Sequence, residues 1–525
     1  MRQRHIQIAD ILETLADAAG ERLALVAGDT RRTFAELDDR ATRLANHLAS
    51  AGISHGDKVG IHSRNCVEWV EAFYACFKIS AVPVNINFRY REAELRHLYG
   101  NSDCVAVIVS PEFAGDVDGV RDAFADLRHM LVIGPDYEDA INTASAERDF
   151  AERSPDDIYM VYTGGTTGLP KGVMWRNEDV VLGALNAYRQ GAPLDGVSQL
   201  EAEIAANSPM SLMTMGPMMH GGSQWAMGNI HMVGGAFVLY CEPRFDAEKV
   251  LDIAVENHVN SLSVFGDAMG KPIADRLLDT SKPTIELPSI FAVSNGAAPL
   301  TTGVRRRLRE AFPNAMVVDS FGASETGATG VGADSEDHSS PRFMMSDDMT
   351  VFADDFRHAD VGEIGMLART GHIPLGYYKD EEKTAATFPV VAGQRWVLPG
   401  DFARREQDGS ITVLGRGSGS INSGAEKIFP EEVEGALMQH PAVADAAVLG
   451  TPNERWGQQV TALVKADGEP PTIDELQDHC KQLLADFKAP KTVLFVEDVP
   501  RTPVGKIDYK TVKSLADDLL TDEAT

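Results

Sequence analysis

The segment Tyr162-Thr-Gly-Gly-Thr-Thr-Gly-Leu-Pro-Lys-Gly172 follows directly after an apolar run of strand length, Ile158–Val161. Glycines let backbone N–H groups approach an anion closely, the threonine hydroxyls add hydrogen-bond donors, and Lys171 adds a positive charge. The segment is not a Walker A loop, because that pattern places lysine directly after the last glycine and Ser or Thr next. The residues predicted to contact a polyphosphate are Thr163, Gly164, Gly165, Thr166, Thr167, Gly168 and Lys171.

Apolar runs of strand length alternate with helical patterns on both sides of this loop. Upstream, Thr33-Phe-Ala-Glu36 is a capping box that opens a helix ending at Gly52. Such alternation predicts parallel sheets covered by helices, with functional residues in loops at the carboxyl ends of the strands. The other predicted strands and helices include Lys58–Ile61, Val67–Lys78, Val82–Ile86, Val105–Val109, Met130–Ile133, Ala236–Tyr240, Ala247–Asn257, Ser261–Val264, Ile290–Val293, Gly303–Phe312 and Val317–Ser320.

The pattern changes near Gly400. Phe402–Arg405 and Ile411–Leu414 flank an Asp-Gly pair that is typical of a hairpin, and a glycine/serine stretch follows. Beyond it, Pro430 opens a helix and strand patterns surround a second helix at Ile473–Asp486. We therefore predict an α/β fold with two domains. A large domain, residues 1–416, has doubly wound, mostly parallel sheets and a β-rich subdomain, and residues 417–525 form a small α+β domain.

The composition excludes several classes of protein. Among 525 residues, Asp+Glu 78 against Lys+Arg 48 gives a net charge of −30, which disfavours nucleic acid and anionic membranes as partners. Five widely spaced cysteines without a CxxC pair argue against disulfides and structural zinc, and favour a cytoplasmic location. The uncharged stretch Ile204–Cys241 contains no apolar run near the ~18 residues of a membrane span, so we expect buried interior or a pocket wall.

The glycine- and threonine-rich loop resembles the phosphate loop of the adenylate-forming superfamily, which includes acyl-CoA synthetases, luciferases and peptide-synthetase adenylation domains. Further motifs occur in that family's order between about residues 20 and 510. The resemblance implies an ATP-dependent carboxylic acid:CoA ligase that works through an acyl-adenylate. It also implies ATP, Mg²⁺ and coenzyme A as ligands, and a mobile C-terminal domain that rotates about Ser418.

Two strings resemble the family's motifs for adenine and the AMP phosphate. In Asn295-Gly-Ala-Ala-Pro299, Gly296 and Ala297 would lie against the purine. In Phe321-Gly-Ala-Ser-Glu325, Phe321 would pack on the adenine, Ser324 would contact the phosphate, and Glu325 would hold Mg²⁺. Gly322 would belong to the same cofactor-binding segment. A carboxylate beside a bound polyphosphate suits a hard cation that prefers oxygen ligands.

Further residues match the family's motifs one by one. Asp401 matches the aspartate that binds the ribose hydroxyls, and Arg416 the arginine that assists there. Lys506 matches the lysine that meets the carboxylate and the α-phosphate during adenylation, and His220 matches a histidine near the acyl pocket. Gly424 and Ala425 match the edge of the pantetheine tunnel. The sequence departs from the pattern at Ser418, where the family has Asp or Lys, and at Ala425, where it has Gly.

Seven methionines between Met210 and Met232 lie where the family's acyl pocket is formed. Methionine fills irregular apolar space. With Met219, Trp225, Phe265 and Gly266, these side chains predict a roomy apolar site for a bulky or long acid. The wider strings look most like the branch of acyl-CoA synthetases that activates steroid side-chain acids and other bulky acids.

Other functions stay open at this point. The nearest are an acyl-AMP ligase that loads a carrier protein and a medium- or long-chain fatty acid CoA ligase. A non-catalytic adenylate-binding protein and a luciferase-like oxygenase are more distant alternatives. The expected partners are a small-molecule carboxylic acid, ATP and CoA, with no nucleic acid and no integral membrane segment. The sequence also leaves a homodimer open.

Overall fold

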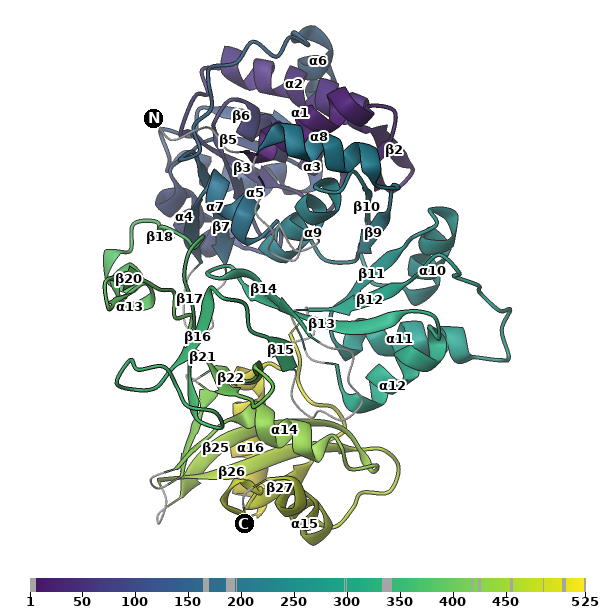
Figure 1. Ribbon diagram of the computed structural model, residues 1–525, viewed down its shortest axis with the longest axis vertical. Helices are drawn as coiled ribbons and strands as arrows, with labels where there is room; N and C mark the ends of the chain where they lie inside the picture. The colour runs from purple at the N-terminus through teal and green to yellow at the C-terminus, as the bar shows by residue number, and fades with distance from the viewer. Residues whose placement is uncertain are drawn as a thin grey trace.

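The structure is a computed structural model that describes residues 6–163, 170–185, 194, 196–296, 298, 300–332, 342–416, 419–423, 426–453, 457–484, 486–502 and 507–523. Two helix-covered sheets form the N-terminal part, an antiparallel sheet follows, and the C-terminal residues form a smaller unit at the far end (Figure 1). This arrangement confirms the predicted fold class. The boundary after residue 416 stays a prediction, since residues 417 and 418 lie outside the described residues.

The larger sheet carries the loops in which the sequence predicts the adenine-binding turn. Its strands are, in sheet order, β14 (Gly327–Val331), β13 (Met316–Ala323), β12 (Ala292–Asn295), β11 (Ser261–Val264), β9 (Ser211–Thr214), β10 (Ala236–Leu239), β1 (Leu23–Ala27) and β2 (Thr30–Thr33). The two edge strands, β2 and β14, pair antiparallel with their neighbours. The six strands between them pair parallel with one another: β1, β10, β9, β11, β12 and β13. Their carboxyl ends therefore meet at one edge of the sheet.

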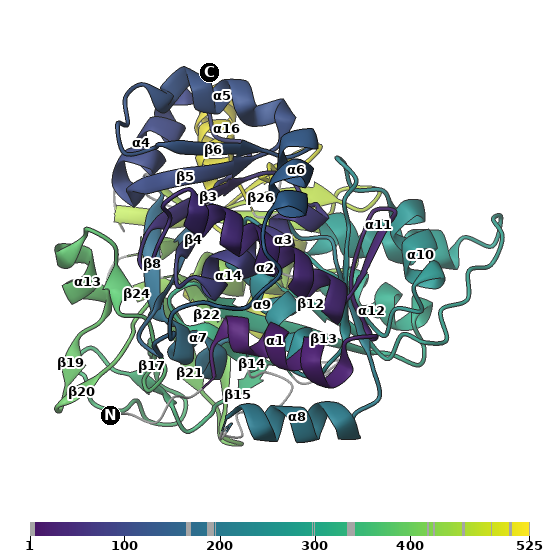
Figure 2. The same ribbon diagram turned by 90° about the horizontal axis from the view of Figure 1, so that it is seen from above.

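Helices cover both faces of this sheet. They are α10 (Ala247–Glu256), α11 (Asp267–Leu278) and α12 (Thr302–Ala311) on one face, and α9 (Gly221–His231) and α1 (Ile8–Ala19) on the other. Leu262 and Val293 belong to the hydrophobic core under α10, α11 and α12. Leu212 and Phe237 belong to the core under α9 and α1. Helix α8 (Val197–Ala206) lies alongside α1 (Figure 2).

The second sheet is parallel throughout. Its strands are, in sheet order, β4 (Val82–Asn85), β3 (Lys58–His62), β5 (Cys104–Val109) and β6 (His129–Val132). Alternate residues of β5 face opposite cores, because strand side chains have a period of two: Ala106 and Ile108 face one core, and Val107 and Val109 the other. The covering helices are α2 (Phe34–Ser50), α3 (Val67–Lys78), α4 (Glu92–Ser102), α5 (Pro111–Arg121) and α6 (Pro135–Thr143).

Antiparallel strands connect these sheets to the C-terminal unit. One sheet contains β18 (Gly376–Tyr377), β8 (Lys171–Arg176) and β7 (Ile158–Thr163), and α7 (Asn177–Gly183) follows β8. A second contains β15 (Arg342–Met344), β22 (Ser410–Arg416), β21 (Asp401–Arg405), β17 (Ile364–Arg369) and β16 (Met349–Phe352). Along the chain, β18 is followed by α13 (Glu381–Thr387), β19 (Val390–Val391) and β20 (Gln394–Arg395), and β21 comes next.

The C-terminal unit is a mixed sheet with helices on both faces. Its elements are β23 (Ile421–Ser423), β24 (Glu426–Ile428), α14 (Pro430–Leu437), β25 (Val443–Asn453), β26 (Gly457–Ala466), α15 (Ile473–Leu483), the 3-10 helix Asp486–Lys488, β27 (Thr492–Phe495) and α16 (Tyr509–Glu523). In β25, Ala446 and Val448 pack under α14 and α15, whereas Ala447 and Leu449 pack under α16.

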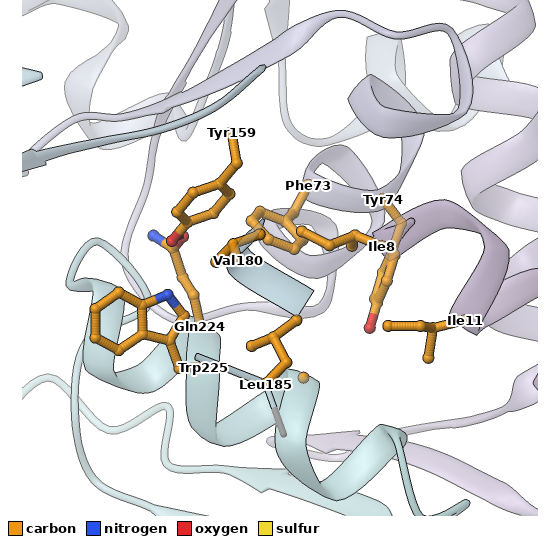
Figure 3. A pocket seen from close by; sticks show the side chains of 10 residues that line it. Ile8, Ile11, Phe73, Tyr74, Tyr159, Val180, Leu185, Gln224 and Trp225 are labelled. Atoms are coloured by element: carbon orange, nitrogen blue, oxygen red, sulfur yellow. Dashed lines mark hydrogen bonds between the residues drawn. The ribbon is translucent and has the colours of Figure 1, made fainter. Parts of the chain in front are cut away.

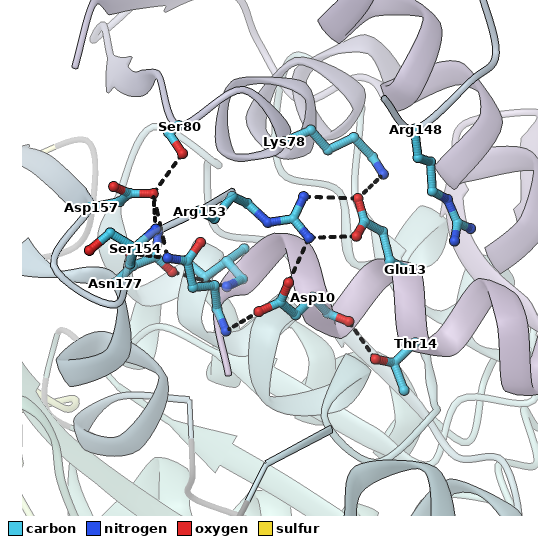
Figure 4. Close-up of polar contacts among 12 residues, drawn as sticks. Asp10, Glu13, Thr14, Lys78, Ser80, Arg148, Arg153, Ser154, Asp157 and Asn177 are labelled. Carbon is cyan, nitrogen blue, oxygen red and sulfur yellow. Dashed lines mark hydrogen bonds and ion pairs between the residues drawn. The ribbon is translucent and has the colours of Figure 1, made fainter. Parts of the chain in front are cut away.

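Buried ion pairs fix helix α1 to its surroundings (Figure 4). Arg153 pairs with Asp10 at 2.6 Å and with Glu13 at 2.5 Å, while Lys78, fully buried on α3, pairs with Glu13 at 2.9 Å and with Asp38 at 2.6 Å. Burial would raise the pKa of Glu13, but the hydrogen bond from Arg153 and the charge of Lys78 outweigh it and lower the pKa to about 2. Removing one partner would leave an uncompensated buried charge, which is costly.

Most predicted elements occur close to where the sequence placed them, and two of the boundary differences have a clear local cause. The strand predicted at Ile290–Val293 begins two residues later, because Ile290 is buried by its apolar side chain while its backbone N–H still closes a turn onto Leu287. The helix predicted to reach Asp486 ends at Leu483, because Leu484 adopts an extended backbone conformation. The capping box of Thr33 and Glu36 is confirmed.

Candidate active site

The two described ends of the predicted phosphate loop lie opposite each other. Thr163 ends β7 and pairs with Lys171, which begins β8, in an antiparallel ladder. Gly164, Gly165, Thr166, Thr167 and Gly168 lie outside the described residues. The Lys171 ammonium is 2.5 Å from a carboxylate oxygen of Asp380, and this hydrogen bond holds the pKa of Asp380 below its usual value. The lysine predicted to meet the phosphates is thus already oriented by a carboxylate.

The predicted adenine turn lies at the carboxyl ends of three parallel strands. Asn295, the last residue of β12, accepts a hydrogen bond from the Gly266 N–H at 2.8 Å and donates to Asp319 at 2.9 Å. Its buried side chain therefore links the loop after β11, the end of β12 and the middle of β13. Within the described part of the chain, a Cβ built on Gly296 would have only the Ser320 carbonyl oxygen within 4 Å, at 3.8 Å. Ala297 lies outside the described residues.

Phe321 and Gly322 belong to strand β13, which continues further than the sequence predicted. The Phe321 ring is half-buried and packs against Phe343, with 5.4 Å between the ring centroids. A Cβ on Gly322 would come 2.4 Å from the Gly327 carbonyl oxygen, so only glycine allows β14 to approach this closely. Whether Phe321 also packs on adenine stays a prediction.

The turn between β13 and β14 carries Ser324 and Glu325, and neighbouring strands hold it from two sides. The buried indole of Trp175 in β8 donates to the Ser324 carbonyl oxygen at 3.0 Å. The hydroxyl of Tyr377 in β18 donates to Oε1 of Glu325 at 2.8 Å. Among the described residues, Oε2 of Glu325 accepts no hydrogen bond. A half-exposed carboxylate oxygen is a suitable donor for Mg²⁺, so the chemistry of this group fits the expected cation.

Asp401 and Arg416 are directly opposed in the β21–β22 ladder, and Asp401 is buried. The structure thus brings the two predicted ribose-binding residues together, although the Arg416 side chain lies outside the described part. Ser418, Gly424, Ala425 and Lys506 also lie outside the described residues. The ends of the segment that carries Lys506 are described: Arg501 bridges to Ile507, and the Arg501 guanidinium pairs with Asp445 at 2.7 Å.

The predicted acyl-pocket residues lie on more than one element. His220 occupies the N-cap position of α9 and is exposed, so it is not a core histidine. Met219, beside it, is buried. Phe265 and Gly266 follow β11. Gly266 has a positive φ of 67°, and the Phe265 ring packs so closely on Gly216 that a Cβ there would come within 2.8 Å of it.

Trp225 lines a small apolar cavity (Figure 3). The Tyr159 hydroxyl donates to Gln224 at 2.7 Å, and the Gln224 amide donates to the Met218 carbonyl at 2.9 Å. This chain of hydrogen bonds connects the polar side of the cavity to the segment before His220. The remaining lining residues are apolar or aromatic and come from α1, α3, α7, the residues after it, and α9: Ile8, Ile11, Phe73, Tyr74, Val180, Leu185 and Gly228.

Sequence reasoning missed four residues of this region: Asn295 as a side-chain link, Trp175, Tyr377 and Asp380. Tyr377 and Asp380 stand in Gly376-Tyr-Tyr-Lys-Asp380, a polar cluster with a glycine whose φ is +145°. The cluster predicts a turn, but it does not predict Glu325 or Lys171 as partners, because these contacts join residues 52 and 209 positions apart in the chain.

No group of three or more His, Cys, Asp or Glu side chains in the described part could hold a metal ion. No described helix is long and apolar enough to cross a membrane.

A family model for AMP-binding enzymes matches residues 12–378, and the model of the AMP-binding enzyme C-terminal domain matches residues 432–506. The chain belongs to the AMP-binding enzyme family. This AMP-binding enzyme is 43% identical to a 3-oxocholest-4-en-26-oate–CoA ligase of Rhodococcus rhodochrous, over 97% of this chain and 95% of the relative. It is 40% identical to a medium/long-chain-fatty-acid–CoA/3-oxocholest-4-en-26-oate–CoA ligase of Mycolicibacterium smegmatis, over 99% and 98%.

Two of the solved structures of similar fold hold an adenylate or a nucleotide. The anthranilate CoA ligase AuaEII in complex with anthranoyl-AMP superimposes with a TM-score of 0.83 at 24% identity, covering 98% of both chains. ATP-bound MatB from Rhodopseudomonas palustris gives a TM-score of 0.82 at 23% identity, covering 98% of this AMP-binding enzyme and 100% of that chain. At this identity the likeness supports the fold alone.

Proposed function

We propose that this AMP-binding enzyme is an ATP-dependent carboxylic acid:CoA ligase that forms AMP and acts on bulky or long apolar acids, including steroid side-chain acids. The observation that carries the proposal is the likeness, over almost the whole chain, to two relatives named as ligases of 3-oxocholest-4-en-26-oate. The relative from M. smegmatis is also named for medium- and long-chain fatty acids, so we include these in the substrate class.

In the first step a carboxylate oxygen of the acid attacks the α-phosphorus of ATP, an acyl–phosphate bond forms, and pyrophosphate leaves. Lys171 and the threonines of the phosphate loop bind the phosphates, and Asp401 holds the ribose hydroxyls. Lys506 stabilises the negative charge that builds between the carboxylate and the α-phosphate. Mg²⁺, held by Glu325, supplies charge neutralisation when it is bound.

In the second step the CoA thiolate attacks the acyl carbon, a thioester forms, and AMP leaves. We propose that the C-terminal domain rotates about Ser418 between the steps, so that Lys506 withdraws and the Gly424–Ala425 segment lines the approach of the thiol. The methyl group of Ala425 narrows this approach modestly compared with the glycine of the family pattern.

An apolar pocket around Met219, Trp225, Phe265 and Gly266 would select the acid. Two of these residues, Met219 and Trp225, belong to the segment 210–232, in which Met213, Met215 and Met218 are also buried. These side chains offer a large apolar contact area and few polar groups. Such a lining favours an acid with a long chain or a ring system over acetate or an amino acid. A cytoplasmic location belongs to the same proposal, and a homodimer stays a prediction.

A product assay tests this function. The enzyme is incubated with ATP, Mg²⁺, CoA and one acid at a time, from acetate through long-chain and aryl acids to a steroid side-chain acid. Thioesters are measured by mass spectrometry. Because each buried methylene contributes about 0.8 kcal/mol, we expect long and steroid acids to exceed acetate in kcat/KM by more than about 100-fold.

Each outcome of the assay has a defined meaning. Omission of ATP or of CoA is the control, and both must abolish the thioester. A preference for acetate would contradict the proposed acyl pocket. Accumulation of acyl-AMP without any thioester would overturn the CoA assignment and would favour a carrier-protein thiol as the acceptor.

A further inference from the structure

The hydroxyl of Tyr377 donates to Oε1 of Glu325 at 2.8 Å, which is the one hydrogen bond to that carboxylate within the described part of the chain. Glu325 stands in the turn between β13 and β14 and is half-exposed, so the ladder of these two strands does not hold its side chain. A carboxylate with one oxygen engaged presents the other in a defined direction. Partners of this kind orient metal ligands and raise their affinity for the cation.

Tyr377 itself is held rigidly. It is 7% exposed, its backbone N–H donates to the Thr384 hydroxyl at 2.9 Å, and its ring meets Phe388 edge-on with 6.0 Å between centroids. At Gly376, φ is +145° and a Cβ would come 2.4 Å from the Thr384 side chain, so glycine is required for α13 to pack this closely. A hydroxyl that is fixed in this way can hold the carboxylate of Glu325 in one orientation.

The strands that hold the turn also connect it to the phosphate loop. β18 pairs antiparallel with β8, which begins at Lys171 and carries Trp175, the donor to Ser324. Three residues after Tyr377, Asp380 pairs with Lys171 at 2.5 Å. One short segment therefore contacts both the predicted metal ligand and the predicted phosphate lysine.

From this geometry we propose that Tyr377 is a positioning residue for the Mg²⁺·ATP site, which it serves by fixing Oε1 of Glu325 so that Oε2 faces the cation. The proposal rests on the proposed function, because it takes Glu325 as the Mg²⁺ ligand. It goes beyond it by assigning a role to a residue that no family motif quoted above contains.

The test compares two neighbouring tyrosines. Tyr377→Phe removes only the hydroxyl that meets Glu325. Tyr378→Phe is the matched control, because the Tyr378 hydroxyl also donates to a carboxylate, that of Asp103, at 2.7 Å, on an exposed part of the surface. Binding of ATP to the full-length enzyme is measured by calorimetry, once with Mg²⁺ and once with a chelator.

We expect Tyr377→Phe to weaken ATP binding in the presence of Mg²⁺ by about 10-fold or more, as other partners of metal ligands do. Binding without Mg²⁺ and the melting temperature should stay close to those of the wild type, and Tyr378→Phe should leave all three unchanged. An equal loss with and without Mg²⁺, or equal behaviour of the two variants, would overturn the proposal.

A double-mutant cycle shows whether Tyr377 acts through Glu325. In the background of Glu325→Ala, Tyr377→Phe should have no further effect on Mg²⁺-dependent binding, whereas an undiminished effect would contradict the proposal. The failure of the proposed function looks different: the wild-type enzyme would then show no Mg²⁺-dependent binding of ATP at all.

Discussion

Lys506→Ala should slow acyl-adenylate formation by about 100- to 1,000-fold, the range for removal of one group that stabilises transition-state charge. In the proposed mechanism the ammonium would meet the attacking carboxylate and the α-phosphate only while negative charge builds between them. Formation of the thioester from supplied acyl-AMP should stay within about two-fold of the wild type, because we propose that Lys506 has withdrawn in that step. Pyrophosphate exchange measures the first step, and thioester release from acyl-AMP the second.

The control for this variant is Lys510→Ala, which removes an exposed lysine from the same part of the chain, in helix α16. It should change neither half-reaction. If Lys506→Ala slows both half-reactions equally, the lysine does not act in adenylation alone, and the proposed alternation of the C-terminal domain is contradicted.

The second large effect concerns the stability of the C-terminal domain. Glu434 in α14 is 4% exposed, accepts hydrogen bonds from the Val448 N–H and the Tyr509 hydroxyl at 2.8 Å each, and has a pKa raised to about 8. Burial is the largest cause, and the negative charge of Glu431 adds to it. Tyr509, Asp445 and Arg501 also lie near this carboxyl group.

The sign of the effect follows from proton binding. Between the unfolded pKa near 4.5 and the folded value of about 8, the native state binds the extra proton, so the domain loses stability as the pH rises through this range. At about 1.4 kcal/mol for each unit of pKa shift, the loss by pH 8.5 amounts to roughly a few kcal/mol. We expect the unfolding transition of this domain to move to lower temperature between pH 5.5 and pH 8.5.

Glu434→Gln keeps a neutral side chain at every pH and should largely remove this dependence. Glu497→Gln, at an exposed carboxylate of the same domain, is the matched control and should retain the slope of the wild type. Scanning calorimetry at a series of pH values measures both variants. Equal slopes in the wild type and in Glu434→Gln would contradict the assigned role of Glu434.

Much of the fold could be predicted from local patterns. The helix Val67–Lys78 and the strand Ser261–Val264 lie where apolar periodicity placed them, because a buried face imposes that periodicity on the sequence. The start of β12 was misplaced since apolar burial at Ile290 precedes strand pairing. Periodicity reports which side chains are buried, and hydrogen-bond pairing sets the ends of an element.

The residues of the candidate site also fall into two groups, those that a local motif predicts and those that only the fold brings together. Glu325, Asp401 and Lys171 could be predicted because each stands in a contiguous string that matches the family's order. Tyr377 and Asp380 could not, because their partners come from strands far away in the chain and only the sheet brings them together. The residues predicted to contact ligands stand in local sequence motifs. The residues that position those side chains are identified only by the packing of the fold.

We propose above that the enzyme activates the acid as an acyl-adenylate before the acid reaches the thiol. The most direct test uses an acid whose carboxylate oxygens carry a heavy isotope, with ATP, Mg²⁺ and CoA, and mass spectrometry of the released AMP. Because a carboxylate oxygen bonds to the α-phosphorus and leaves with it, we predict one heavy oxygen in each AMP formed. Unlabelled AMP, or ADP as the product, would contradict the account.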